Sequence, residues 1–135
     1  MNAKEFLDRY RRINAKIDRK KERISELRSR ATRLSPTAMF DHNGSVTDRV
    51  GQNAARIADL ESEIESMKQD AAAIREEIEH VISRVDDERL RELLAMRYIH
   101  RYSWRKIAIK MSFSRDHVRG YLHSRALQKV NTFLL

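Results

Sequence analysis

Apolar side chains recur at alternating spacings of four and three residues along two long stretches of this chain. The first stretch contains Phe6, Tyr10, Ile13, Ile17, Ile24, Leu27, Ala31 and Leu34. The second contains Val50, Ile57, Leu60, Ile64, Met67, Ala71, Ile74, Ile78, Val81 and Val85. This is the a/d pattern of a heptad repeat, whose narrow apolar stripe packs against a partner helix. The pattern predicts two long coiled-coil helices, over residues 4 to 34 and 50 to 84.

Composition also favours an all-α fold. The 135 residues include only 3 Gly and 1 Pro. A β-sandwich or barrel needs a turn every several residues, and turns draw on these two residue types, so an all-β fold is excluded. The length allows one ordinary domain, or a small domain with an extended element, and it excludes a large multi-domain enzyme.

The two heptad stretches are separated by a loop predicted at about residues 35 to 50, which holds Pro36 and the turn dipeptide Asn43-Gly44. So short a connection favours a long antiparallel hairpin within one chain. A parallel coiled coil between two chains fits the same stripe, and we expect the coiled coil to support a homo-oligomer. Two d positions are polar, Lys20 and Asn53, and such residues fix register at a cost in stability.

The net charge of +8 is unevenly distributed. Residues 1–34 carry 12 Lys/Arg against 5 Asp/Glu, and residues 35–100 carry 8 against 14. Residues 101–135 carry 8 against a single acid, Asp116. The N-terminal run is typical of a solvated helix face, whereas the C-terminal excess predicts a polyanionic partner. Without an export signal, a membrane span or any Cys, we expect a cytoplasmic protein with no membrane partner.

The C-terminal region reads as a small helical domain, residues 86–135, after a first domain of residues 1–85. Asp86 and Asp87 can cap a helix with apolar positions Leu90, Leu93, Leu94 and Tyr98. Ser103 and Ser114 can then cap two further helices, SWRKIAIKM and SRDHVRGYLHSRALQKV, with only Ser112-Phe113 between them. This arrangement is typical of a helix-turn-helix.

A helix-turn-helix makes packing demands that this segment meets. Six residues have suitable side chains for the inner positions: Ile107, Ala108, Met111, Phe113, Val118 and Tyr121. Ser112 occupies the turn position where Gly is preferred, at a cost of about 1 kcal/mol if φ is positive there. Trp104 is interpreted as an anchor of the domain core.

The outward residues of the second helix would face the major groove of double-stranded DNA. The predicted base contacts are Ser114, Arg115, Asp116, Arg119, Gly120 and His123. The predicted phosphate contacts are Arg101, Arg105, Lys106, Lys110, Arg125 and Lys129.

The stretch from Leu90 to Leu127 resembles region 4 of sigma-70 family factors. The shared features are an apolar-Arg-Tyr helix end, a Ser-aromatic pair, Ile-Ala and a closing His-x-x-Ala-Leu. The whole chain resembles the small sigma-like proteins encoded by phages and prophages of Gram-positive bacteria. It departs from the pattern at Ser112, where Gly is usual, and in an interval from Val118 to Ala126 that is one residue longer. The resemblance implies a sequence-specific transcription regulator in the bacterial cytoplasm, with RNA polymerase as a further partner.

Two other functions fit a coiled coil joined to a helix-turn-helix. One is a DNA-recognition subunit for phage packaging, similar to small terminase subunits, and the other is a coiled-coil adaptor that binds protein. We expect no enzyme and no cofactor, because no phosphate loop, nucleophile elbow or inward-facing carboxylate pair occurs. We also expect no metal, because the 5 His have no Cys beside them and no consistent ligand spacing.

Overall fold

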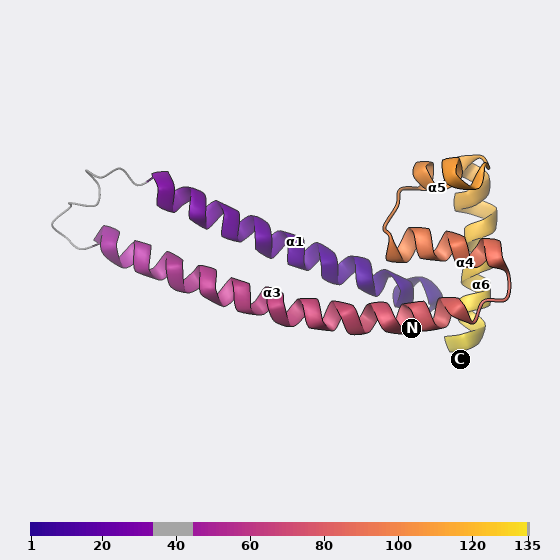
Figure 1. Ribbon diagram of the computed structural model, residues 1–135, viewed down its shortest axis with the longest axis horizontal. Coiled ribbons are helices and arrows are strands. Elements are labelled where there is room, and N and C mark those ends of the chain that lie inside the picture. The colour runs from indigo at the N-terminus through magenta and orange to yellow at the C-terminus, as the bar shows by residue number, and fades with distance from the viewer. Residues whose placement is uncertain (34–44, 135) are drawn as a thin grey trace. The chain divides into compact units, whose positions relative to one another are not determined.

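The computed structural model describes residues 1–33 and 45–134, and within these ranges it is helical with no strand (Figure 1). The α-helices are α1 (Ala3–Arg33), α3 (Ser45–Ser83), α4 (Glu88–Leu94), α5 (Trp104–Met111) and α6 (His123–Leu134). Two π-helical segments interrupt the C-terminal region: η1 (Ala95–Ile99) continues α4, and η2 (His117–Leu122) leads into α6. The prediction of an all-α fold is confirmed. Residues 34–44, most of the predicted loop, lie outside the described ranges.

The two long helices have nearly the bounds that the heptads predict. Helix α1 begins after a capping box, in which the Glu5 N–H donates to Asn2 Oδ1 (2.9 Å) and the Asn2 N–H donates to Glu5 Oε2 (3.2 Å). Helix α3 begins at Ser45, five residues before the predicted start. Contacts divide the chain into two compact units, a terminal unit of residues 1–13 and 71–135 and a middle unit of residues 14–70.

The middle unit is built around part of the predicted apolar stripe. Its buried apolar side chains are Ile17, Ile24, Leu27, Leu60 and Ile64. Two ion pairs flank them, Lys20 Nζ to Glu63 Oε2 (2.8 Å) and Arg28 Nη2 to Glu61 Oε1 (2.7 Å). From Lys20 to Arg28 along α1, the partner on α3 changes from Glu63 to Glu61.

The terminal unit has one apolar core that gathers residues from both ends of the chain. Its members are Ala3, Leu7, Ile78, Ile82, Val85, Leu90, Leu93, Leu94, Tyr98, Ile99, Ile107, Ala108, Val118, Leu122, Ala126 and Val130. Helix α4 packs against α6, and α5 packs against η1 and η2 (Figure 1). The predicted boundary between residues 85 and 86 therefore lies inside this core.

The first turns of α1 are more deeply buried than the heptad pattern predicts. Ala3 and Leu7, which lie off the predicted stripe, are fully buried, whereas Phe6, Tyr10 and Ile13 on the stripe are half-buried. The Ala3 N–H also donates to Asn131 Oδ1 on α6 (2.8 Å). The beginning of α1 thus packs against the C-terminal elements. This packing covers a second face of α1, which the heptad pattern of two paired helices leaves exposed.

The predicted cap and core of the third helix are confirmed. Asp87 Oδ1 accepts hydrogen bonds from the N–H groups of Arg89 (2.9 Å) and Leu90 (3.4 Å), so this residue is the N-cap of α4. All four predicted apolar positions of the helix are buried. Helix α4 with η1 therefore supplies the platform on which α5 and the last helix pack.

Candidate nucleic-acid interface

The turn between α5 and the next helix has the left-handed geometry that the sequence suggested. Ser112 has φ 60° and ψ 38°, and the Phe113 N–H donates to the carbonyl of Ala108 (3.1 Å). These are features of a Schellman ending, for which Gly is the usual residue. Ser103 Oγ accepts from the Lys106 N–H (3.2 Å) and Ser114 Oγ from the His117 N–H (3.1 Å), so both predicted serine caps are confirmed.

The inner face of the last helix differs from the prediction at one position. Val118 is buried as predicted, but Tyr121, expected on the inner face, is 53% exposed, and Leu122 takes the buried position instead. The cause is η2, where the His123 N–H donates to the carbonyl of Val118, five residues back. A π turn takes one more residue than an α turn, and it shifts the phase of every residue that follows.

The same π turn accounts for the long interval from Val118 to Ala126. Both of these side chains are fully buried. Of the other inner residues, Ile107 and Ala108 are buried as predicted, and Met111 and Phe113 are half-buried. The π-helical segment accommodates the extra residue, and the buried face of the last helix continues to Val130.

Five of the six predicted base-contact residues are exposed: Ser114, Arg115, Asp116, Arg119 and Gly120. A Cβ added at Gly120 would meet no atom within 4 Å, so the backbone is open to close approach there. His123 differs, because its ring is half-buried and its Nε2 lies 2.5 Å from the Tyr98 hydroxyl. It lines a pocket beside the outer face of the helix.

The predicted phosphate contacts lie on α5, α6 and the segment before α5. Five of them are exposed: Arg101, Arg105, Lys106, Lys110 and Arg125. Two are held by neighbouring aromatic rings, since Arg125 Nη1 donates to the Tyr121 hydroxyl (2.9 Å) and Lys106 Nζ lies 3.9 Å from the centre of the Tyr102 ring. Lys129 is half-buried and pairs with Asp86 (3.5 Å). Arg101 has a φ of 59°, so among the described residues it shares the left-handed backbone conformation with Ser112.

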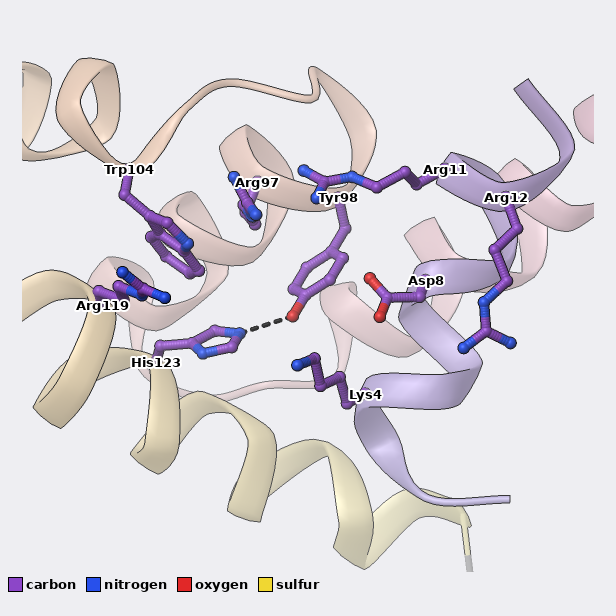
Figure 2. Close-up of a pocket in the computed structure, with 9 residues that line it drawn as sticks. All are labelled: Lys4, Asp8, Arg11, Arg12, Arg97, Tyr98, Trp104, Arg119 and His123. Atoms are coloured by element: carbon purple, nitrogen blue, oxygen red, sulfur yellow. Dashed lines mark hydrogen bonds between the residues drawn. The ribbon is translucent and has the colours of Figure 1, made fainter. Parts of the chain in front are cut away.

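The pocket beside this face has a volume of about 370 Å³. Figure 2 shows the residues that line it: Lys4, Asp8, Arg11, Arg12, Arg97, Tyr98, Trp104, Arg119 and His123. They come from α1, η1, α5, η2 and α6 and belong to the terminal unit. Five are cations and only Asp8 is an acid. Within residues 1–33 and 45–134, no ion pair joins any of the five cations to a carboxylate.

Burial and positive charge set the protonation states in this pocket. Burial, then the charges of Arg97 and Lys4, lower the pKa of His123 from 6.5 to about 4, so the ring is neutral at pH 7. Burial raises the pKa of Tyr98 to about 12. Burial and the nearby Arg11 lower the pKa of Arg97, whose Nη1 donates to the Tyr102 carbonyl (3.1 Å) and whose guanidinium lies 4.3 Å from the Trp104 ring centre.

Sequence reasoning missed most of this pocket. The charge pattern of residues 1–34 predicts a solvated helix face for Lys4, Arg11 and Arg12, and the sequence places Arg97 only at a helix end. Trp104, interpreted as a core anchor, is half-buried and forms one wall, with its ring centre 4.7 Å from that of His123. The available signal was the excess of Lys and Arg in residues 1–34.

No protein-family model matches the chain, and neither a curated protein nor a solved structure matches it. Along residues 1–33 and 45–134, no helix combines the length and apolar character needed to cross a bilayer. In the same ranges, no group of three or more His, Asp or Glu side chains is placed to hold a metal ion.

Proposed function

We propose that this protein is a sequence-specific DNA-binding transcription regulator of the sigma-like type. In this proposal a long antiparallel hairpin of α1 and α3 precedes a small helix-turn-helix domain, in which α5 is the first helix and η2 with α6 is the recognition helix. One observation gives this proposal its main support. The left-handed turn at Ser112 joins two capped helices that bury Ile107 and Val118, and the second helix leaves its N-terminal cations exposed.

The recognition helix would enter the major groove with its N-terminal end. Arg115 and Arg119 are four residues apart and both exposed, and each can donate two hydrogen bonds to guanine O6 and N7. Asp116 can accept from cytosine N4. Each well-placed bidentate contact contributes about 1 to 3 kcal/mol of discrimination between bases. Gly120 has no side chain to hold the helix away from the floor of the groove.

The exposed cations on either side of this helix would bind backbone phosphates. Arg105, Lys106 and Lys110 lie on α5, and Arg125 lies on α6. Such contacts fix the orientation of a protein on the duplex and carry no sequence information. Because they release counterions, binding weakens steeply with salt. Lys129 would join them by exchanging Asp86 for a phosphate.

The order of the ion pairs between α1 and α3 supports the hairpin. Lys20 with Glu63 and Arg28 with Glu61 suit helices that run in opposite directions. By the resemblance to sigma-70 region 4, RNA polymerase is proposed as a second partner and the bacterial cytoplasm as the setting. The coiled coil is proposed as the surface of a homo-oligomer.

Selection from a pool of randomised DNA duplexes tests the function directly. The full chain should enrich a short common motif at moderate salt, and a chain carrying Arg115→Ala and Arg119→Ala should enrich none. A pool that stays random while still binding would contradict sequence-specific recognition. Absence of binding even at low salt would favour the protein adaptor, and a ring-shaped assembly in solution would favour the packaging subunit.

A further inference from the structure

The pocket in Figure 2 is lined by five cations and by one acid, Asp8, so positive charge is in excess there. Lys4, Arg11 and Arg12 reach it from α1, and Arg97 and Arg119 reach it from η1 and η2. Like charges gathered in a partly buried space oppose folding, and such arrangements occur where a ligand of opposite charge binds. The lowered pKa of Arg97, caused by burial and by Arg11, reflects this crowding.

Arg119 connects the pocket to the proposed DNA-reading face. It is one of the exposed residues on the outer side of the recognition helix, and it also lines the pocket beside His123. A helix in the major groove has a sugar-phosphate strand on each side of it. The pocket therefore lies where one of these strands would pass.

We propose that the pocket is a phosphate site that holds one backbone phosphate of the bound duplex, so that the first turns of α1 belong to the DNA interface. The proposal rests on the DNA-binding function proposed above and extends it. It assigns to Lys4, Arg11 and Arg12 a role in binding that the resemblance to a sigma-like C-terminal domain does not imply.

The chemistry of the lining fits a phosphate. Arginine guanidinium groups match phosphate oxygens with paired hydrogen bonds, and four of the five cations here are arginines, which come from three different elements. The volume of about 370 Å³ is at the lower end of ligand-sized cavities, which suits a single sugar-phosphate unit better than a larger ligand. His123 and Tyr98 add neutral hydrogen-bonding groups on one wall.

Trp104 provides a probe confined to this site, because it is the only Trp of the chain and lines the pocket. We expect its fluorescence to change when the full chain binds a short duplex that carries the selected motif. In the variant Arg11→Gln/Arg12→Gln the change should be lost, binding should weaken about tenfold at 0.1 M salt, and the salt slope should fall by about one.

A matched variant controls for overall charge. Arg19→Gln/Arg30→Gln removes two exposed arginines from the same helix, outside the pocket, and should leave the fluorescence change and the salt slope close to those of the unmodified chain. The pocket variant should also melt no lower than the unmodified chain, because it relieves repulsion. Equal losses of affinity in the two variants, or a loss explained by a lower melting temperature, would overturn the proposal.

A single substitution, Lys4→Gln, provides a second test at the same site and should weaken binding in the same direction. Inorganic phosphate serves as the competing probe. If it changes Trp104 fluorescence at micromolar concentration while the duplex does not, the site takes a small anion and the backbone assignment is wrong. If the pocket variant reads the selected motif with unchanged affinity, the pocket proposal fails and the DNA-binding function stands. If the unmodified chain binds no duplex, the function itself fails.

Discussion

The hydroxyl of Tyr98 lies 2.5 Å from Nε2 of His123, and this contact joins η1 to the first residue of α6. Tyr98 belongs to η1, and His123 directly follows η2. The two rings are also stacked, with their centres 5.8 Å apart. The pair therefore holds the beginning of α6 against the platform of α4 and η1, with His123 in its neutral form.

The first prediction is that His123 makes the fold sensitive to acid. Burial and the charges of Arg97 and Lys4 lower its pKa from 6.5 to about 4, against the opposing effect of Asp8. Between these two pKa values the unfolded chain takes up a proton that the folded chain does not. The free energy of unfolding therefore keeps its full value, as far as His123 is concerned, above about pH 6.5, and it falls as the pH drops toward 4. His123→Gln, which cannot titrate, should lose less stability over this window, as measured by urea unfolding at several pH values.

A histidine elsewhere provides the control for that series. His100 is exposed on the same unit, and His100→Gln serves as the control for the loss of a histidine as such. Equal acid sensitivity in the unmodified chain and in His123→Gln would show that other groups cause the loss, and would remove the basis for a neutral His123 in the pocket.

The second prediction concerns the left-handed turn. Ser112→Gly should stabilise the protein by about 1 kcal/mol, because a residue without Cβ adopts positive φ at no steric cost. The melting temperature should rise by about 3 to 5 °C for a chain of this size. Ser114→Ala, two residues on, should instead lower stability by about 1 kcal/mol through loss of the cap. A Ser112→Gly variant that melts lower would contradict the turn geometry.

Local rules predicted much of this fold. The heptad stripe identified Ile24, Leu27 and Ile64 as buried, and side-chain caps identified Ser103 and Ser114 as helix starts. Each of these features depends on residues within a few positions of one another or on one helical period. For the same reason the left-handed turn could be anticipated from one position, Ser112, which stands where a helix-turn-helix prefers Gly.

Other features depend on packing between distant segments, and the sequence did not reveal them. The π turn leaves one trace in the sequence, the long interval from Val118 to Ala126, but this interval does not locate the extra residue, and Leu122 occupies the inner position predicted for Tyr121. Leu7 was missed because it belongs to a core that gathers residues from distant parts of the chain. The pocket was missed because Arg11 and Arg97 are brought together only when the beginning of α1 packs with η1.

The third prediction separates stability from binding at Gly120. A Cβ would meet no atom within 4 Å there, so Gly120→Ala should stabilise the helix by about 1 kcal/mol. The same methyl group should weaken binding to the selected duplex if the backbone approaches the floor of the groove. Thermal melting and a duplex titration of one protein preparation would measure both effects. A gain in stability with unchanged affinity would remove Gly120 from the interface.

The fourth prediction concerns Lys20, a half-buried cation at a d position of the seam. Its Nζ pairs with Glu63 Oε2 at 2.8 Å, and this hydrogen bond and charge lower the pKa of Glu63. Lys20→Leu should raise the melting temperature and broaden the range of oligomers in sedimentation, because a polar seam residue specifies register at a cost in stability. Lys21→Leu, on the exposed side, is the matched control. An unchanged melting temperature would mean that Lys20 already covers the seam with its methylene groups.

The most direct test of the central claim is a titration of Arg115→Ala, Arg119→Ala, Lys110→Ala and Arg125→Ala against selected and scrambled duplexes at several salt concentrations. Loss of Arg115 or Arg119 should cost about 1 to 3 kcal/mol on the selected duplex and much less on the scrambled one. Loss of Lys110 or Arg125 should weaken both duplexes alike and reduce the salt slope by about one. If Arg115→Ala and Arg119→Ala weaken both duplexes equally, the recognition helix reads no sequence, and the account of a sequence-specific regulator is contradicted.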